Sequence, residues 1–360
     1  MMRRRRVGAT APASRLVLSA VSMGVVLLAA LRIAAVLIAA APGAAASPVV
    51  ATEPGDRAQV IERYRSVLEP LLRIPTGFSG NVAGCDPGTI SQANADATLA
   101  AVNYVRGLAQ LPPVVLNPRR SAEAQASALI MAANGSLTHA PEKDARCWTK
   151  AGYDGASHGN LSLGWSDPPA AVPQSTGPRA VLGYMEDPGA SNDFAGHRRW
   201  LLWQGLAEIG TGDTDVSNTI VVIPEDFAAH RGTAWVPWPS AGAFPRELEP
   251  SGRWSLSYPN ADFSRARIKM TGPDGTSIKV RVNPIRSGYA DNTIVWEAAL
   301  PSSYRSAPDV DYPVTVTVSG VRLPGGKVVR RTWTTTLVRA TSGPSLRARP
   351  GGLEAVLVRR

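Results

Sequence analysis

The sequence contains few of the residues from which local catalytic and metal-binding motifs are built. Its 360 residues include two cysteines and four histidines. Neither Cys85 nor Cys147 has a Cys-x-x-Cys partner, which excludes a zinc finger and a dithiol redox motif. The chain also lacks a His-Glu-x-x-His segment, a Gly-x-Ser-x-Gly nucleophile turn and a glycine-rich phosphate loop. Functional residues must therefore be sought among groups that only the fold brings together.

The net charge of +10 overstates how basic the folded part of the chain is. Six of the 38 basic residues lie in the first 46 positions, and the other 32 face 28 acidic residues, which leaves about +4. Residues 341–360 carry four arginines and little apolar material, so we expect a basic disordered tail. No basic platform with interleaved aromatic residues accompanies the charge, and we expect no nucleic-acid partner.

Residues 1–46 have the pattern of a signal peptide. Arg3 to Arg6 form a positive start, a long apolar stretch follows, and Ala44-Ala45-Ala46-Ser47 resembles a cleavage site. We expect a secreted, extracellular protein. The stretch is also long enough to span a bilayer, so an uncleaved anchor with the domains outside is the alternative and the one expected route to a membrane. In an exported chain the isolated pair Cys85 and Cys147 predicts a disulfide.

The remainder divides by pattern into four segments. Residues 47–84 are a lead-in with one helix over 58–72, and residues 85–224 mix helices and strands. Residues 225–250 are rich in proline and glycine, which indicates a linker. Residues 251–340 contain short alternating strands separated by turn signals, which is typical of an immunoglobulin- or fibronectin-like β-sandwich. The fold class is therefore α+β.

Within 85–224 the periodicity and the capping residues predict four helices and two strands. The expected helices cover 91–111, 118–134, 178–186 and 194–202, and the expected strands cover 207–212 and 218–223. The stretch that follows His139, through Cys147 and Asn160, is expected to be mostly loop.

Two histidines follow helical segments in this block. His139 comes after the helix over 118–134, His197 opens the helix over 194–202, and Glu186 lies between them. If the fold brings them together, imidazole and carboxylate suit zinc and leave a position for water. The alternative is that the histidines cap helices or bind backbone groups and that Glu186 is solvated.

The block from 91 to 223 resembles the CAP superfamily of cysteine-rich secretory, antigen 5 and pathogenesis-related-one proteins, in its bacterial exported form. The matching residues occur in the family order, namely Asn103-Tyr-Val-Arg106, Leu116-Asn117, Ala124, Ala128 and Ala132, His139, Asn160-Leu161, Gly196-His197-Arg198 and Ile209-Gly210-Thr-Gly212. The resemblance implies a three-layer α-β-α sandwich, here followed by the all-β domain.

The resemblance also implies a cleft of two histidines and two acids that can hold zinc. By position the histidines are His139 and His197, one acid is Glu186, and Asn160 lines the cleft. The second acid is missing, because Gly159 stands where the family has glutamate. His158 is adjacent and is the candidate replacement ligand.

The resemblance favours binding over catalysis. We expect an exported protein that binds a small apolar ligand such as a lipid or sterol, or a cell-envelope component, through this cleft. A metal-assisted hydrolase of peptide or cell-wall material, with His197 or Glu186 as base, is the alternative. A structural envelope protein is the third interpretation.

Overall fold

A computed structural model describes residues 56–164, 173–225 and 232–341. The predicted signal peptide and nearly all of the predicted basic tail lie outside these residues. Within them, no helix has the length and apolar character needed to cross a bilayer. The described part begins with α1 (Arg57–Arg63), which continues through a π-helical stretch (Tyr64–Leu68) into α2 (Glu69–Leu71). This helix confirms the one predicted over 58–72.

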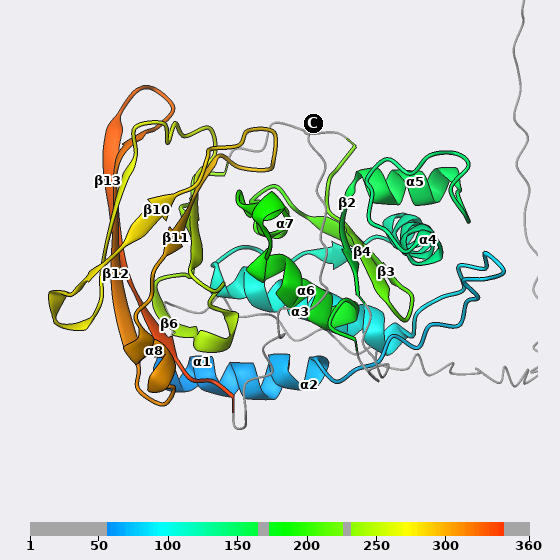
Figure 1. The fold of residues 1–360 in the computed structure, drawn as a ribbon, viewed down its shortest axis with the longest axis horizontal. Coiled ribbons are helices and arrows are strands. Elements are labelled where there is room, and N and C mark those ends of the chain that lie inside the picture. The colour runs from blue at the N-terminus through cyan, green and yellow to red at the C-terminus, as the bar shows by residue number, and fades with distance from the viewer. Residues whose placement is uncertain (1–55, 165–172, 226–231, 342–360) are drawn as a thin grey trace, which may run out of the picture. The chain divides into compact units, whose positions relative to one another are not determined.

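The first half of the fold is a four-stranded sheet between two helical layers (Figure 1). The strand order is β1-β3-β4-β2, with β1 parallel to β3 and the other pairs antiparallel. The strands are β1 (Val115–Leu116), β2 (Gly159–Leu163), β3 (Glu208–Asp213) and β4 (Ser217–Val221). The helices are α3 (Gln92–Leu108), α4 (Pro118–Asn134), α5 (Lys150–Ser157), α6 (Gly177–Glu186) and α7 (Gly196–Leu201). This arrangement confirms the predicted α-β-α sandwich.

The capping residues fix the helix ends as the sequence predicts. Ser91 accepts a hydrogen bond from the Asn94 backbone N–H at the start of α3. Asn117 caps α4 in the same way, and Gly135 ends α4 in the left-handed conformation with φ of 60°. The predicted helix over 118–134 is therefore confirmed at both ends.

The segment expected to be loop contains α5 and β2. The apolar periodicity is absent because α5 packs on α4 through glycines instead of large side chains. A Cβ on Gly155 would lie 2.2 Å from the Glu123 carbonyl oxygen, and one on Gly152 would lie 2.5 Å from Ile130 Cδ1. The two helices approach so closely that only glycine fits at these positions.

The second half is a sandwich of two sheets, as predicted. The inner sheet has the order β10-β11-β7-β5 and the outer sheet the order β6-β13-β12-β8-β9. Trp254 and Trp296 from the inner sheet are fully buried, and the Trp296 ring lies 6.4 Å from the ring of Trp333 in the outer sheet. The strands are β5 (Val236–Trp238), β6 (Gly242–Pro245), β7 (Arg253–Ser257), β8 (Arg267–Thr271), β9 (Ser277–Ile278), β10 (Val280–Val282), β11 (Thr293–Ala298), β12 (Tyr312–Arg322) and β13 (Val328–Val338). A short helix, α8 (Ser302–Ser306), precedes β12.

The two halves share one hydrophobic core. The segment predicted as a linker, 225–250, contributes β5 to the inner sheet and β6 to the outer one. Trp238 in β5 is fully buried, and its ring meets Phe244 of β6 edge-on. One continuous cluster of buried residues includes Tyr64 of the lead-in, Tyr184 of α6 and Trp254 of β7. The proline- and glycine-rich composition therefore marks edge strands and turns packed on both halves.

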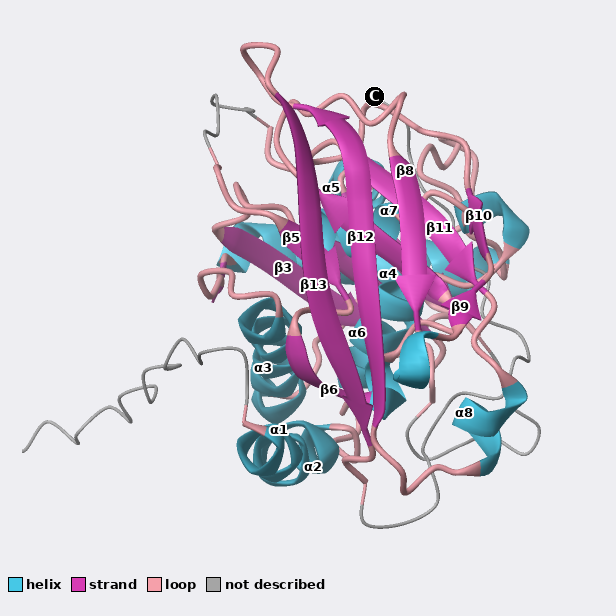
Figure 2. Cartoon of the chain, turned by 90° about the vertical axis from the view of Figure 1, so that its left-hand side faces the viewer, coloured by secondary structure: helices cyan, strands magenta, loops and turns pink. Residues whose placement is uncertain are grey.

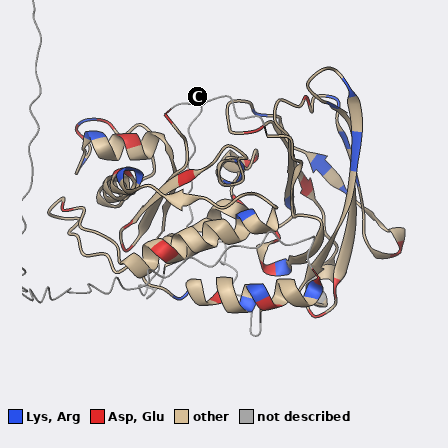
Figure 3. Ribbon diagram, turned by 180° about the vertical axis from the view of Figure 1, so that it is seen from behind, with Lys and Arg blue, Asp and Glu red and all other residues tan. Residues whose placement is uncertain are grey.

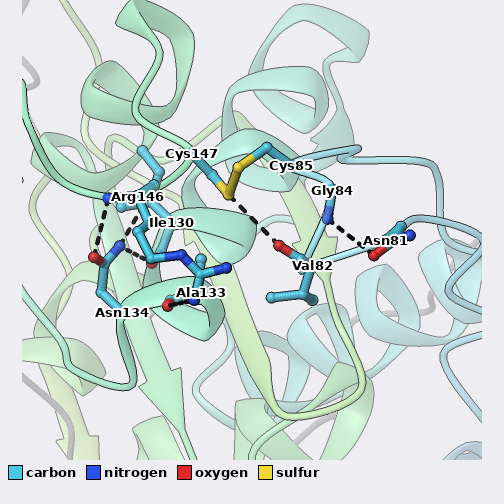
Figure 4. Close-up of a disulfide and its surroundings, with 9 residues drawn as sticks. All are labelled: Asn81, Val82, Gly84, Cys85, Ile130, Ala133, Asn134, Arg146 and Cys147. Atoms are coloured by element: carbon cyan, nitrogen blue, oxygen red, sulfur yellow. Dashed lines mark hydrogen bonds between the residues drawn. A yellow bond between two sulfur atoms is a disulfide. The ribbon is translucent and has the colours of Figure 1, made fainter.

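The disulfide between Cys85 and Cys147 is present, as predicted, with the Cα atoms 5.0 Å apart (Figure 4). It joins the segment before α3 to the loop that follows α4. That loop is also held by Asn134, whose side chain accepts from the Arg146 backbone N–H and donates to the Arg146 carbonyl. The loop that carries His139 is thus anchored at both of its ends.

Removing this disulfide should destabilise the protein strongly. The bridge closes a loop with a sequence separation of 62 residues, for which loop-closure entropy predicts a loss of about 4 kcal/mol in the free energy of unfolding. We expect Cys85→Ser/Cys147→Ser to lower the urea midpoint, with a larger m-value because the unfolded chain without the bridge is more expanded. An unchanged midpoint would show that the unfolded chain gains no conformational freedom when the disulfide is removed.

Candidate functional site

His139 lies in the anchored loop just beyond α4. Its side chain is nearly buried, with 7% of its surface exposed, and its Nδ1 atom lies 2.6 Å from the Ala156 carbonyl oxygen at the end of α5. A carbonyl oxygen can only accept, so Nδ1 carries the proton. In the neutral ring Nε2 is then a hydrogen-bond acceptor.

His158 is held in the same way at the C-terminal end of α5. Its Nδ1 atom lies 2.9 Å from the Asp154 carbonyl oxygen and 2.9 Å from the Ser157 hydroxyl. The side chain is half-buried. The carbonyl again requires the proton on Nδ1, so this ring presents the same tautomer as His139.

His197 is enclosed in the protein and paired with a buried carboxylate. Its Nδ1 atom lies 2.7 Å from Asp187 Oδ1, and both side chains have no exposed surface. Asp187 Oδ2 accepts the backbone N–H groups of His197 and Arg198, at 2.9 and 3.3 Å, and so caps α7. The imidazole also stacks on Tyr184, with ring centres 5.3 Å apart. The orientation of this ring is therefore fixed from three directions.

Asn160 connects His197 to the edge strand β2. Its Nδ2 atom donates to the His197 carbonyl oxygen at 3.1 Å, and its own carbonyl accepts from the Tyr184 hydroxyl at 3.2 Å. The strand begins directly after His158, whose partner α5 also holds His139. His139 and His158 are thus held by the C-terminal end of α5, and the His197 carbonyl is held by Asn160 of the strand that follows. We call His139, His158, Asn160, Asp187 and His197 the histidine site.

Glu186 has a different partner from the one the sequence suggests. Its Oε1 atom accepts from the Ser251 hydroxyl at 2.7 Å, before β7 in the second half of the protein. The acid that contacts His197 is the next residue, Asp187. Asp187 adopts φ of 55° and ψ of 55°, and this left-handed turn directs its carboxylate toward α7. Sequence reasoning missed Asp187 because it lies beside a better match to the family position.

The histidine site does not provide a metal-ligand set within the residues that the structure describes. No group of three or more His, Cys, Asp or Glu side chains among them is arranged to hold an ion. The Nδ1 atoms of the histidines bind protein acceptors, and the Glu186 carboxylate binds Ser251. Structural and catalytic zinc need three or four convergent ligands, and the described residues do not assemble such a set around these histidines.

Two buried arginines next to His197 join the halves of the protein. Arg198 is fully buried and donates to the carbonyls of Met185 and Glu186 on one side and of Arg253 on the other. Arg199 donates to the carbonyls of Arg286 and Asp291. Burial lowers the pKa of both guanidinium groups to about 10, so both remain charged at neutral pH and need these acceptors.

Arg253 of β7 connects the two halves in the other direction, from the second half to the first. Its guanidinium donates to the carbonyl of Asp187, and to those of Gly189 and Asn192 at 3.1 and 3.4 Å. Glu297 of β11 holds the same guanidinium at 2.8 Å. A residue of the sandwich therefore fixes the loop that carries the carboxylate partner of His197.

Comparison with known families agrees with this geometry. Residues 99–223 match the Cysteine-rich secretory protein family, CAP, over about a third of the chain. These residues form a CAP domain. No curated protein and no solved structure gives a match to the chain. The CAP match ends just beyond β4, so the sandwich is an addition to it.

A buried polar network runs from the histidine site across the sheet of the CAP domain. Tyr184 donates to the Asn218 side chain at 2.9 Å, and Asn218 donates to Asp213 at 2.9 Å. Asp213 also accepts from the Gly177 backbone N–H at 2.7 Å. Its other oxygen, Oδ2, is buried without a partner among the described residues. Burial raises the pKa of Asp213 to about 7, because desolvation opposes the charged form more than two hydrogen bonds favour it.

This network makes stability depend on pH in a specific direction. An unfolded aspartate loses its proton near pH 4, whereas the folded protein keeps it to about pH 7. Between these values the folded state binds more protons, so the free energy of unfolding falls as pH rises. Asp213→Asn resembles the protonated acid and should remove this loss. We expect urea unfolding to show that the free energy of unfolding of Asp213→Asn rises relative to that of the unsubstituted protein from pH 5 to 8. If the two free energies instead had parallel pH dependences, the ionised carboxylate would be in a favourable environment.

The Asp187–His197 pair predicts a change of tautomer in Asp187→Asn. An asparagine tolerates the left-handed backbone and can keep one oxygen on the α7 N–H groups, but its NH₂ group then faces His197 Nδ1. We expect the imidazole proton to move to Nε2, which long-range ¹H–¹⁵N correlation spectra resolve, with a stability loss of about 1–3 kcal/mol. Retention of the Nδ1–H tautomer would show that Asp187 does not set it.

Proposed function

We propose that this protein is exported and that its CAP domain binds a small ligand with an apolar body and a hydroxyl head at the histidine site. A sterol or a lipid alcohol of the cell envelope has this chemistry. The observation that carries the proposal is the common tautomer of the histidines. Each holds its Nδ1 proton on a protein acceptor, which fixes the orientation of the ring before a ligand arrives.

The loop that carries His139 covers a buried apolar cluster. A small apolar cluster, separate from the main core, contains Ile130, Met131, Ala156 and Leu161, with Leu137 packed against it. The loop that carries His139 rests on this cluster, because the Thr138 backbone N–H contacts Met131 Sδ at 3.4 Å. Methionine adapts to ligands of irregular shape. These side chains are buried, so an apolar ligand body would reach them, with its hydroxyl at His139 and His158, only if the loop that carries His139 moves aside.

Export is supported by the disulfide. A bridge such as Cys85–Cys147 persists in an oxidising compartment and is rare in the cytosol. The leader-like pattern of residues 1–46 points the same way, and secreted material would begin near Ser47 if the leader is removed. N-terminal sequencing of protein from the culture medium tests this point.

The buried His197–Asp187 pair favours one alternative function. An imidazole oriented by a carboxylate is the arrangement of a general base, so a hydrolase of peptide or cell-wall material is the second candidate. In that reaction Asp187 would hold the ring, and the site would have to open before Nε2 could accept a proton from water, because the His197 side chain has no exposed surface. The zinc-assisted version would need three convergent ligands, and no such group occurs among the described residues.

A pair of substitutions at His139 separates ligand binding from folding. In His139→Asn the amide NH₂ replaces the Nδ1 donor to Ala156, whereas the Nε2 acceptor is lost. We expect the affinity for a fluorescent sterol, or for 1-dodecanol in a separate titration, to fall about tenfold, because one acceptor is removed. The free energy of unfolding should change little. His158→Asn should have the same effect, and the exposed Lys143→Gln should have none.

Three outcomes would contradict the binding proposal. Equal affinity in His139→Asn and the natural chain would place the ligand elsewhere. Stoichiometric zinc in the purified protein, lost in His139→Ala/His197→Ala, would show a metal centre completed outside the described residues. Turnover of a peptide or muropeptide library that is lost in His197→Asn would favour the hydrolase.

A further inference from the structure

The outer sheet of the sandwich presents an ordered polar face away from the CAP domain. In the register of β8, β12 and β13, three rows of residues cross the sheet side by side. These rows are Thr271–Thr315–Thr334, Lys269–Thr317–Thr332 and Arg267–Ser319–Arg330. The Thr315 and Thr334 hydroxyls are 2.9 Å apart and those of Thr317 and Thr332 are 3.0 Å apart. Figure 2 shows these strands toward the viewer.

The alternate residues of the same strands fill the core. Val314, Val316 and Val318 of β12 have no exposed surface, and Met270 and Trp333 from the neighbouring strands are also buried. Because successive residues of a strand point to opposite faces, the threonine and basic rows are on the solvent side. We call the three rows the outer basic face.

The outer basic face has charge of one sign. The strands β8, β12 and β13 contain five Lys and Arg residues and no Asp or Glu. Arg267, Lys269 and Arg330 are exposed, and none of them forms an ion pair with an acid in the described part of the chain. Asp262 lies at the edge of this face in a backbone bridge with Arg322. Figure 3 marks Lys and Arg of these strands in blue.

The residues of the outer basic face limit which class of partner can bind it. No aromatic side chain projects from it, since Trp333 points inward, so it provides neither a stacking platform for bases nor a wedge for a bilayer. Hydroxyl rows between fixed positive charges match a partner that itself carries both hydroxyl and anionic groups. A polysaccharide with carboxylate groups has that composition, and its charges would replace the acids that the face lacks.

We propose that the outer basic face is a docking surface for an anionic polysaccharide. Arg267 and Arg330 stand two strands apart, about 10 Å, and Arg267 and Lys269 stand two residues apart, about 7 Å. These intervals let one glycan chain run across the strands and meet several positive charges in succession. The inference does not rest on the ligand proposed for the histidine site, because the residues concerned belong to another sheet.

The test compares binding of the purified full chain to polygalacturonate and to neutral dextran. We expect polygalacturonate binding that weakens as NaCl rises from about 50 to about 200 mM, and no dextran binding. Arg267→Gln/Lys269→Gln/Arg330→Gln should weaken it by about tenfold or more, because three contacts of modest strength are lost. Arg73→Gln/Arg119→Gln/Lys143→Gln has the same change of net charge at exposed sites of the first half, and it should retain affinity within about twofold.

A third variant separates the hydroxyl rows from the charges. Thr317→Val/Thr332→Val keeps all basic residues and should reduce polygalacturonate affinity measurably at the higher salt concentration, where charge attraction is screened. Equal losses of polygalacturonate affinity in the two triple variants would overturn the proposal, since they would reflect net charge alone. Tighter binding to vesicles containing phosphatidylglycerol than to polygalacturonate would overturn it as well, by making the face a membrane contact.

Discussion

A carboxylate without access to water controls the architecture around the histidine site. Asp187 has no exposed surface, and a buried charge is tolerated only where donors replace its hydration. The His197 ring and the first N–H groups of α7 supply these donors, so α7 can start only where it does. The buried guanidinium of Arg198 adds a favourable charge nearby. Each of these groups is unfavourable to bury alone, and together they specify one arrangement of the loop between α6 and α7.

This constraint extends into the sandwich because the same loop is held from the other side. Arg253 of β7 donates to the Asp187 carbonyl, and Arg198 donates to the Arg253 carbonyl at 2.7 Å. Each of the two arginines therefore donates to a backbone carbonyl in the other half of the protein, inside a common apolar core. The sandwich therefore acts on the CAP domain as a positioning element.

The sequence predicted those parts of the fold that have local causes. Asn117 and Gly135 bound α4 because capping is decided within a few residues, whereas α5 escaped detection because Gly152 and Gly155 packing against α4 leaves no apolar period. The same distinction applies to the site, where individual residues could be predicted but their pairing could not. His139 and His197 could be nominated by family order, but the pairing of His197 with Asp187 instead of Glu186 depends on one left-handed turn. The contacts of Arg198 are to backbone groups distant in the chain, which no side-chain pattern records.

The two sheets of the sandwich have different roles. The ligand proposed for the histidine site and the partner proposed for the outer basic face can therefore be tested separately. The inner sheet meets the CAP domain through Arg253 and Asn283, the latter donating to the Asp193 carbonyl at 2.6 Å, so its sequence is constrained by the loop it positions. The outer sheet meets the inner one through tryptophans and valines, and no other element of the described chain packs on the three rows of its solvent face. Folding alone does not require three basic residues unpaired with acids there, because like charges on adjacent strands repel. A partner outside the chain gives that arrangement a physical reason that the packing of the protein does not supply.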